Sequence, residues 1–295
     1  KFPQMNFTGL CHEISSLQRY LPTILETEFS NLKLKAGGLN HFSIIVEGKY
    51  RDSGKDIYPD LMKKASVFFE SAPGYSDVLD YVRRTGKVPG TEGAATEWDI
   101  DVTKSSRPWS DRWLFRDLME RFNVFPITVD SHLGEYISWA HDSADHQGIL
   151  DFYEFYRGAL SKKTFSEIKL ELHERVVPIM EGITTDSGTI ESAVNIMNKG
   201  YIPDFPSNVA VEVPGKLTGK GIEGFAFDSY PKGFGALIRS YAGVYDLTAE
   251  AILQQSRDLV IQGLLVNPVV SVSGVIPQMV DHFLDSQRRW LSYIR

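Results

Sequence analysis

Two hydrophobic periods alternate along the first 50 residues, and this alternation limits the folds that the chain can adopt. Residues 5–11 form a short, partly apolar run typical of a strand, and residues 14–25 carry apolar side chains at helical spacing. Two more strand-like runs, 32–36 and 39–46, follow with a pair of glycines between them. Strand, helix and strand in succession predict part of an α/β sheet with parallel strands.

Helical periodicity dominates the chain beyond residue 49. Apolar residues at helical spacing predict helices near 57–69, 110–122 and 149–160. In the C-terminal third, Thr248 is a suitable N-cap for a helix through Leu265, and a further helix is expected over 276–294. The sequence therefore predicts a helix-rich α/β (α+β) protein.

Charge and composition exclude several classes of function. The chain carries 31 basic and 38 acidic residues, for a net charge of −7 without a basic cluster, so nucleic acid is not an expected partner. No apolar run approaches the roughly 18 residues of a membrane span, so no membrane partner is expected. Cys11 is the only cysteine, which excludes an internal disulfide and favours a reducing, cytoplasmic location.

One glycine motif resembles a nucleotide-binding loop in its letters alone. Residues 219–224 read GKGIEG and match GxGxxG. A dinucleotide site needs a buried strand before the motif and a helix after it. Here Pro214 is expected to end the preceding strand, and residues 225–231 do not form a helix pattern. We therefore interpret the motif as a plain turn after a strand at 209–214.

Cys11-His12 and Asn40-His41 are the most chemically informative pairs. Parallel strands joined by a helix would place both pairs at one sheet edge, where open α/β sheets bind ligands. A thiolate and an imidazole together can hold a divalent transition metal and leave positions for substrate oxygens. From the spacing alone, a buried structural cysteine and an unrelated histidine is the simpler interpretation.

A second group of polar residues lies at 130–136. Asp130, His132, Glu135 and Tyr136 place two acids, an imidazole and a phenol within seven residues, DSHLGEY. Such a group can supply general acid–base chemistry. A polar helix N-terminus, capped by Asp130 or by the serine after it, explains the same composition.

At these residues the sequence resembles glycoside hydrolase family 4, the NAD- and metal-dependent glycosidases. The resemblance is carried, in family order, by GLCHE at 9–13, GLNHF at 38–42, the segment 130–136, NVAVEVP at 208–214 and the C-terminal segment 246–268.

The resemblance implies the last strands of a Rossmann-type sheet followed by a lactate-dehydrogenase-like C-terminal catalytic domain. The division is expected as 1–48, the end of the dinucleotide-binding domain, and 49–295, a helix-rich catalytic and oligomerisation domain. The family's enzymes begin with a Rossmann domain, so the chain is expected to be a portion lacking about 165 N-terminal residues, a usual domain size. Such a portion should not bind NAD alone, and a homo-oligomer, dimer or tetramer, is expected.

The resemblance also implies a reaction and its cofactors. NAD takes a hydride from C3 of the sugar, a base removes the C2 proton, the aglycone leaves by elimination, and the hydride returns after water has added. Cys11 and His41 are then the ligands of Mn²⁺, or of another divalent transition metal. Asn40 and His132 are expected at the small sugar substrate, and no cofactor-binding residue for NAD is assigned.

The acid and the base follow from the same resemblance. Asp130 matches the base of the α-glucosidase branch, and Tyr136 is the alternative. His12 follows the metal cysteine, as in the branch that acts on unphosphorylated α-glucosides, α-galactosides and α-galacturonides, and is the expected acid for the leaving group.

Two other classes of function remain open at this point. One is a non-catalytic homologue whose surfaces serve only in assembly. The other is an NAD-dependent dehydrogenase of a 2-hydroxy acid, which normally uses a His–Asp pair, so that Cys11 argues against it.

Overall fold

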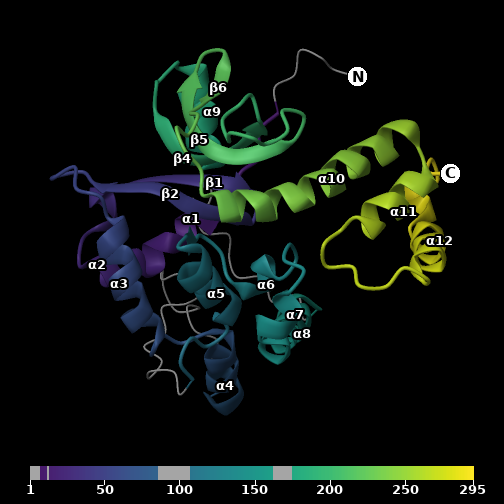
Figure 1. Cartoon of the computed structure of the whole chain (residues 1–295), viewed down its shortest axis with the longest axis horizontal. Coiled ribbons are helices and arrows are strands. Elements are labelled where there is room, and N and C mark those ends of the chain that lie inside the picture. The colour runs from purple at the N-terminus through teal and green to yellow at the C-terminus, as the bar shows by residue number, and fades with distance from the viewer. Residues whose placement is uncertain (1–6, 12, 86–106, 162–174) are drawn as a thin grey trace.

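The computed structural model describes residues 7–11, 13–85, 107–161 and 175–295 and mixes helices and strands along the chain (Figure 1). This confirms the helix-rich α/β class. The strands are β1 (Leu32–Leu39), β2 (Phe42–Tyr50), β3 (Phe125–Pro126), β4 (Ile190–Met197), β5 (Ala210–Thr218) and β6 (Gly221–Gly224). The helices are α1 (Glu13–Ser16), α2 (Leu21–Leu25), α3 (Tyr58–Phe69), α4 (Tyr75–Thr85), α5 (Trp113–Phe122), α6 (Asp130–Leu133), α7 (Ala140–Ser143), α8 (His146–Ser161), α9 (Val176–Thr184), α10 (Lys232–Gln254), α11 (Arg257–Leu265), α12 (Ile276–Ser286) and α13 (Arg288–Leu291), with 3-10 turns η1 (Leu17–Arg19) and η2 (Phe29–Asn31).

The sheet is antiparallel, so the expectation of parallel strands is wrong. Its order is β3-β2-β1-β5-β4, with β6 paired to β5, and each strand pair in the described part of the chain is antiparallel. Gly9 forms an antiparallel bridge with Asn195 of β4, whereas a parallel pair with residues 39–46 was expected. The reason lies in the short connections, because a turn of two residues joins only antiparallel strands.

The break between β1 and β2 lies at Asn40 and His41, two residues later than the glycines suggested. Both glycines belong to β1, where Gly37 pairs with Ile44 and Gly38 with Ser43. The glycines are needed for close packing rather than for a turn. A Cβ at Gly37 would lie 2.6 Å from the ring of Phe227, and one at Gly38 would lie 2.6 Å from Cα of Ser43.

Strand β5 continues past Pro214, which was expected to end it. The missing N–H of Pro214 is tolerated, and its carbonyl oxygen accepts a hydrogen bond from the N–H of Phe225 (2.9 Å). The GxGxxG segment begins in the turn between β5 and β6 and continues as β6, where Thr218 pairs with Gly221. The interpretation of that segment as a turn is therefore right for residues 219–220 and wrong for 221–224, which form a strand.

The long C-terminal helix begins well before Thr248. Helix α10 starts at Lys232 and ends at the left-handed Gln255, after which Ser256 caps α11 through the N–H of Leu259. The expected single helix 248–265 is therefore wrong at both its start and its middle. Glycines at 233, 235 and 243 lower the helix propensity of this segment and concealed its beginning.

A single large core joins the sheet to the surrounding helices. It contains buried residues of β1, β2, β5, α3, α5 and α10, and Figure 1 shows α2, α3 and α5 on one side of the hairpin formed by β1 and β2. Because β5 pairs with β1, the sheet crosses the predicted boundary at residue 48, and that boundary stays a prediction. In the described residues, no helix is both long and apolar enough to span a membrane.

Candidate functional site

Two distant segments meet beside the tip of the β1–β2 hairpin. Gly9 exchanges two backbone hydrogen bonds with Asn195 (3.0 and 2.9 Å), which fixes the chain just before Cys11. The Cys11 thiol lies close enough to the backbone of Glu13 and of His41 for both to act to lower its pKa. The structure thus brings Cys11 to the hairpin turn that carries His41, although their role as metal ligands stays a prediction.

His41 occupies an uncommon backbone conformation. Its φ of 60° lies in the left-handed region, which non-glycine residues seldom adopt outside turns and functional sites. Its imidazole contacts that of His132 on α6, with ring centroids 4.3 Å apart. Nε2 of His132 lies 3.9 Å from Oε1 of the buried Glu13. The imidazole of His41 therefore lies against that of His132, and the buried carboxyl of Glu13 lies next to His132.

Asn40, the other turn residue, is held by hydrogen bonds on its backbone and its side chain. The Tyr136 hydroxyl donates to the carbonyl oxygen of Asn40 (2.9 Å). The ring of Tyr136 stacks on Phe42, with centroids 4.8 Å apart. Nδ2 of Asn195 donates to Oδ1 of Asn40 (3.4 Å). Tyr136 therefore touches the turn directly, as a group acting on a substrate there would have to.

Asp130 has a structural task in this fold. Its two carboxylate oxygens accept hydrogen bonds from the N–H groups of Leu114 and Phe115 (2.8 Å each) at the first turn of α5. The side chain is fully buried, and burial raises the pKa of Asp130 to about 7. Its role as the catalytic base stays a prediction. The same two oxygens already bind the first N–H groups of α5. His12, the expected acid, lies outside the described residues.

Glu212 is a site residue that sequence reasoning missed. It lies on β5 directly between Asn195 of β4 and Gly38 of β1 in the sheet register, and it is fully buried. Burial raises the pKa of Glu212 to about 7, while Ser43 and Asn195 beside it act in the opposite direction. The signal available in the sequence was a charged residue flanked by two valines in a strand, a pattern that indicates an unusual buried carboxyl.

The thiol of Cys11 and the imidazole of His41 are donors that suit a transition metal, and other oxygens would have to complete its coordination. Burial, and after it the charge of Glu212, raise the pKa of Cys11 to about 12, so the thiol keeps its proton until a cation lowers that pKa. Among the residues that the structure describes, no three His, Cys, Asp or Glu side chains form a cluster able to hold a metal ion. A metal here would need ligands beyond Cys11 and His41, and their role as its ligands stays a prediction.

A cavity of about 300 Å³ opens on another side of Cys11, between β1 and β4. Its walls mix apolar side chains, such as Ile14 and Ile179, with polar ones, such as Gln18, Ser192 and Arg175. Arg175 makes two hydrogen bonds to the buried Glu191 (2.7 and 2.9 Å). Cys11 therefore lies near the hairpin tip and also lines a cleft of mixed polarity.

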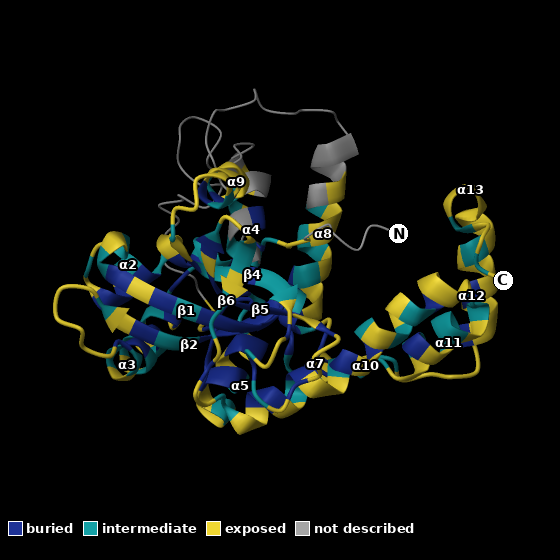
Figure 2. Ribbon diagram, turned by 90° about the horizontal axis from the view of Figure 1, so that it is seen from above, coloured by how far each residue is buried: buried dark blue, intermediate teal, exposed yellow. Residues whose placement is uncertain are grey.

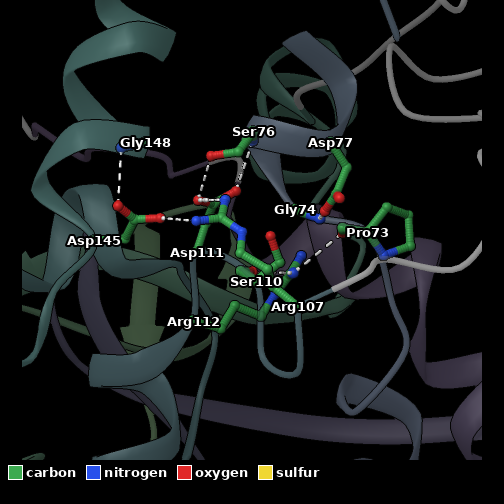
Figure 3. Close-up of polar contacts among 10 residues, drawn as sticks. All are labelled: Pro73, Gly74, Ser76, Asp77, Arg107, Ser110, Asp111, Arg112, Asp145 and Gly148. Atoms are coloured by element: carbon green, nitrogen blue, oxygen red, sulfur yellow. Dashed lines mark hydrogen bonds and ion pairs between the residues drawn. The ribbon is translucent and has the colours of Figure 1, made fainter. Parts of the chain in front are cut away.

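A separate acidic cluster serves the architecture (Figure 3). Asp111 accepts hydrogen bonds from the N–H and the hydroxyl of Ser76 (2.8 and 2.9 Å), and Asp145 accepts from the N–H of Gly148 (3.0 Å). Arg107 lies 3.3 Å from Asp145. Burial, and after it the neighbouring Asp145, raise the pKa of Asp111. The cluster joins the start of α4, the segment before α5 and the start of α8.

The chain matches the model of the "Family 4 glycosyl hydrolase C-terminal domain" over residues 36–270. It is 52% identical to an α-glucosidase of Erwinia rhapontici over 295 residues, which is 100% of this chain and 65% of that protein. It is also 21% identical to an α-galacturonidase of Bacillus subtilis, over 92% of this chain and 59% of that one. The chain thus spans less than two thirds of each of these relatives.

Solved structures show the same fold. A 6-phospho-β-glucosidase of Thermotoga maritima, solved with manganese, NAD⁺ and glucose-6-phosphate, superposes with a TM-score of 0.64 at 17% identity, covering 96% of this chain and 60% of that one. A 6-phospho-α-glucosidase from gut microorganisms, in complex with NAD and Mn²⁺, gives a TM-score of 0.62 at 16% identity, covering 95% and 61%. At these identities the similarity concerns the fold.

Replacing Asp130 by Asn should change how stability depends on pH. The pKa of Asp130 is raised from 3.8 to about 7 in the folded state, so the folded protein holds a proton that the unfolded chain releases. The contribution of Asp130 to the free energy of unfolding is then greatest below about pH 4 and falls as pH rises towards 7. We expect the stability lost in Asp130→Asn to shrink across this window in urea titrations. A loss that grows with pH would contradict the raised pKa.

Proposed function

The chain belongs to family 4 of the glycosyl hydrolases, and from this we propose that the protein that carries it hydrolyses the O-glycosidic bond of an unphosphorylated α-glucoside. The identity of 52% to an α-glucosidase over the whole chain supports this substrate before α-galactosides and α-galacturonides. The observation that carries the proposal is the meeting of Cys11 with the His41 turn, since it joins the two segments that the reaction requires.

The proposed cofactors are NAD and Mn²⁺. When bound, NAD takes a hydride from C3 of the sugar and returns it, and Mn²⁺ stabilises negative charge on the neighbouring sugar oxygens. Cys11 and His41 are the residues that would hold the metal. Support comes from the soft thiol and imidazole donors at the turn and from the relatives solved with NAD and manganese. No residue of this chain is assigned to NAD, since the one glycine motif belongs to the β5–β6 turn and to β6.

The remaining side chains of the turn are proposed to bind and deprotonate the sugar. Asn40 precedes His41 in the turn and His132 contacts the ring of His41, and both are proposed to hydrogen-bond sugar hydroxyls. We propose Tyr136, rather than Asp130, as the base at C2. The hydroxyl of Tyr136 reaches the turn, whereas both oxygens of Asp130 are engaged by α5. Burial raises the pKa of Tyr136, so it needs a nearby cation to act. His12 is proposed as the acid that protonates the leaving group.

Assembly into a homo-oligomer, a dimer or a tetramer, belongs to the same proposal. Helices α10–α13 lead away from the sheet, and much of their surface is exposed (Figure 2). Apolar side chains there include Leu253, Phe283 and Trp290, which are 75%, 52% and 66% exposed. An apolar surface of this kind is typical of a contact with another subunit.

Replacing Cys11 by Ser in the protein that carries this chain should remove its metal-dependent activity. Ser is close to Cys in size and can meet the same backbone groups, so we expect the free energy of unfolding to change by less than about 1 kcal/mol. The loss of a metal ligand should lower kcat on a p-nitrophenyl α-glucoside by more than about 100-fold, because even the loss of a residue that only supports a ligand costs about 10- to 100-fold. The assay includes NAD and Mn²⁺, and binding of Mn²⁺ is followed by electron paramagnetic resonance. Full activity in this variant would rule out Cys11 as a ligand.

Replacing Tyr136 by Phe should suppress proton exchange at C2 of the sugar. Removal of a general base usually costs about 10²–10⁴-fold in rate. The experiment follows incorporation of deuterium from the solvent at C2, with Asp130→Asn as the paired variant. We expect Tyr136→Phe to lose exchange and Asp130→Asn to lose stability with exchange retained. The opposite pattern, normal exchange in Tyr136→Phe and none in Asp130→Asn, returns the role to Asp130.

A further inference from the structure

Three polar side chains form a continuous relay from the middle of the sheet to the hairpin tip. Asn195 of β4 is the central member. Its Nδ2 atom donates to Oε2 of Glu212 at 3.2 Å and to Oδ1 of Asn40 at 3.4 Å. Because Asn195 and Glu212 are direct cross-strand partners, the sheet register itself holds the first two members together.

The chemistry of the first member sets the orientation of the other two. In the structure Asn195 turns its NH₂ group, and not its oxygen, toward Glu212, and an ionised carboxylate, which only accepts hydrogen bonds, favours this orientation. The NH₂ group has two hydrogens, and the second is directed at Asn40. Asn40 must therefore turn its oxygen toward Asn195, and its own NH₂ group points to the other side of the amide.

We propose that Glu212 and Asn195 are positioning residues that fix Asn40 with its NH₂ group presented as a donor to a sugar hydroxyl. This inference rests on the proposed function and deepens it, because it gives the direction of one substrate hydrogen bond. A site with a fixed donor binds an acceptor oxygen at that point. It discriminates against a sugar that lacks the oxygen, since a donor covered by the bound sugar would then remain unpaired.

The burial of Glu212 is difficult to explain by stability alone. The carboxyl is fully buried, and Oε1 has no hydrogen-bond partner among the described residues. Taking a carboxyl out of water costs free energy, and one hydrogen bond from Asn195 offsets only part of that cost. A carboxyl retained under these conditions fits a role in orienting Asn195.

A pair of substitutions separates the hydrogen bond from the fold. Glu212→Met keeps the volume and removes the acceptor, whereas Glu212→Gln keeps one acceptor oxygen that can face Asn195. We expect the urea midpoint of Glu212→Met to change little, because the loss of a buried carboxyl and the loss of the acceptor of Asn195 oppose each other. Hydrogen exchange of the Asn195 side-chain NH₂, followed by NMR of the ¹⁵N-labelled protein, should accelerate by at least about tenfold in Glu212→Met and little in Glu212→Gln.

Kinetics on a p-nitrophenyl α-glucoside give the second readout. We expect kcat/KM to fall about 10- to 100-fold in Glu212→Met and to be largely restored in Glu212→Gln. In an Asn40→Ala background, Glu212→Met should cost less than about twofold more, because both act through one contact. Glu191→Met is the matched control, since Glu191 is a buried glutamate on β4 whose partner is Arg175, and kcat/KM should be unchanged.

The outcomes distinguish the relay from the proposed function. An unchanged exchange rate of Asn195 in Glu212→Met overturns the relay whatever the activity. The relay is also overturned if the losses of kcat/KM in Glu212→Met and Asn40→Ala multiply in the double variant. Equal losses of kcat/KM in Glu212→Met and Glu212→Gln overturn it as well. If the wild-type protein shows slow exchange but hydrolyses no glycoside with NAD and Mn²⁺, the proposed function fails while the orientation of Asn40 stands.

Discussion

The candidate site depends on one row of residues that crosses the sheet. Gly9 pairs with Asn195, Asn195 with Glu212, Glu212 with Gly38, and Gly38 with Ser43. The row fixes the chain before the cysteine on one side and the hairpin turn on the other. A slip of one residue in any strand would turn the carboxyl and amide side chains to the opposite face. Sheet register, rather than helix packing, therefore positions the chemistry.

The buried carboxyls of this fold have different roles, although each of them is removed from water. Asp111 and Asp145 bind backbone N–H groups and join three segments. Asp130 binds two N–H groups at the start of a helix. One oxygen of Glu212 accepts a hydrogen bond from the side-chain amide of Asn195, and the other has no partner in the part of the chain described. Carboxyls saturated by backbone groups hold the architecture, and the unsaturated one lies next to the candidate metal site.

Much of the class and chemistry could be predicted from the sequence, but the way strands pair could not. The helix-rich α/β class followed from hydrophobic periodicity, whereas Cys11 and Asn40-His41 were singled out as site residues by the family resemblance, since their spacing alone favoured a structural cysteine. The turn could not be located, because Gly37-Gly38 has the composition of a turn yet serves close packing against Phe227. Glu212 was hidden for a related reason, since its partner Asn195 lies on a strand that carried no recognised pattern. Contacts between distant strands are a property of the fold and not of local sequence.

The central claim is that the thiol of Cys11 and the imidazole of His41 share one divalent cation at the hairpin turn. Addition of Co²⁺ to the protein that carries this chain tests it directly, because a thiolate bound to Co²⁺ gives a near-ultraviolet charge-transfer absorption. We expect this absorption to appear with one equivalent of Co²⁺, to be absent in Cys11→Ser and to be weakened in His41→Ala. An identical absorption in Cys11→Ser, or none in the wild-type protein, would contradict the claim.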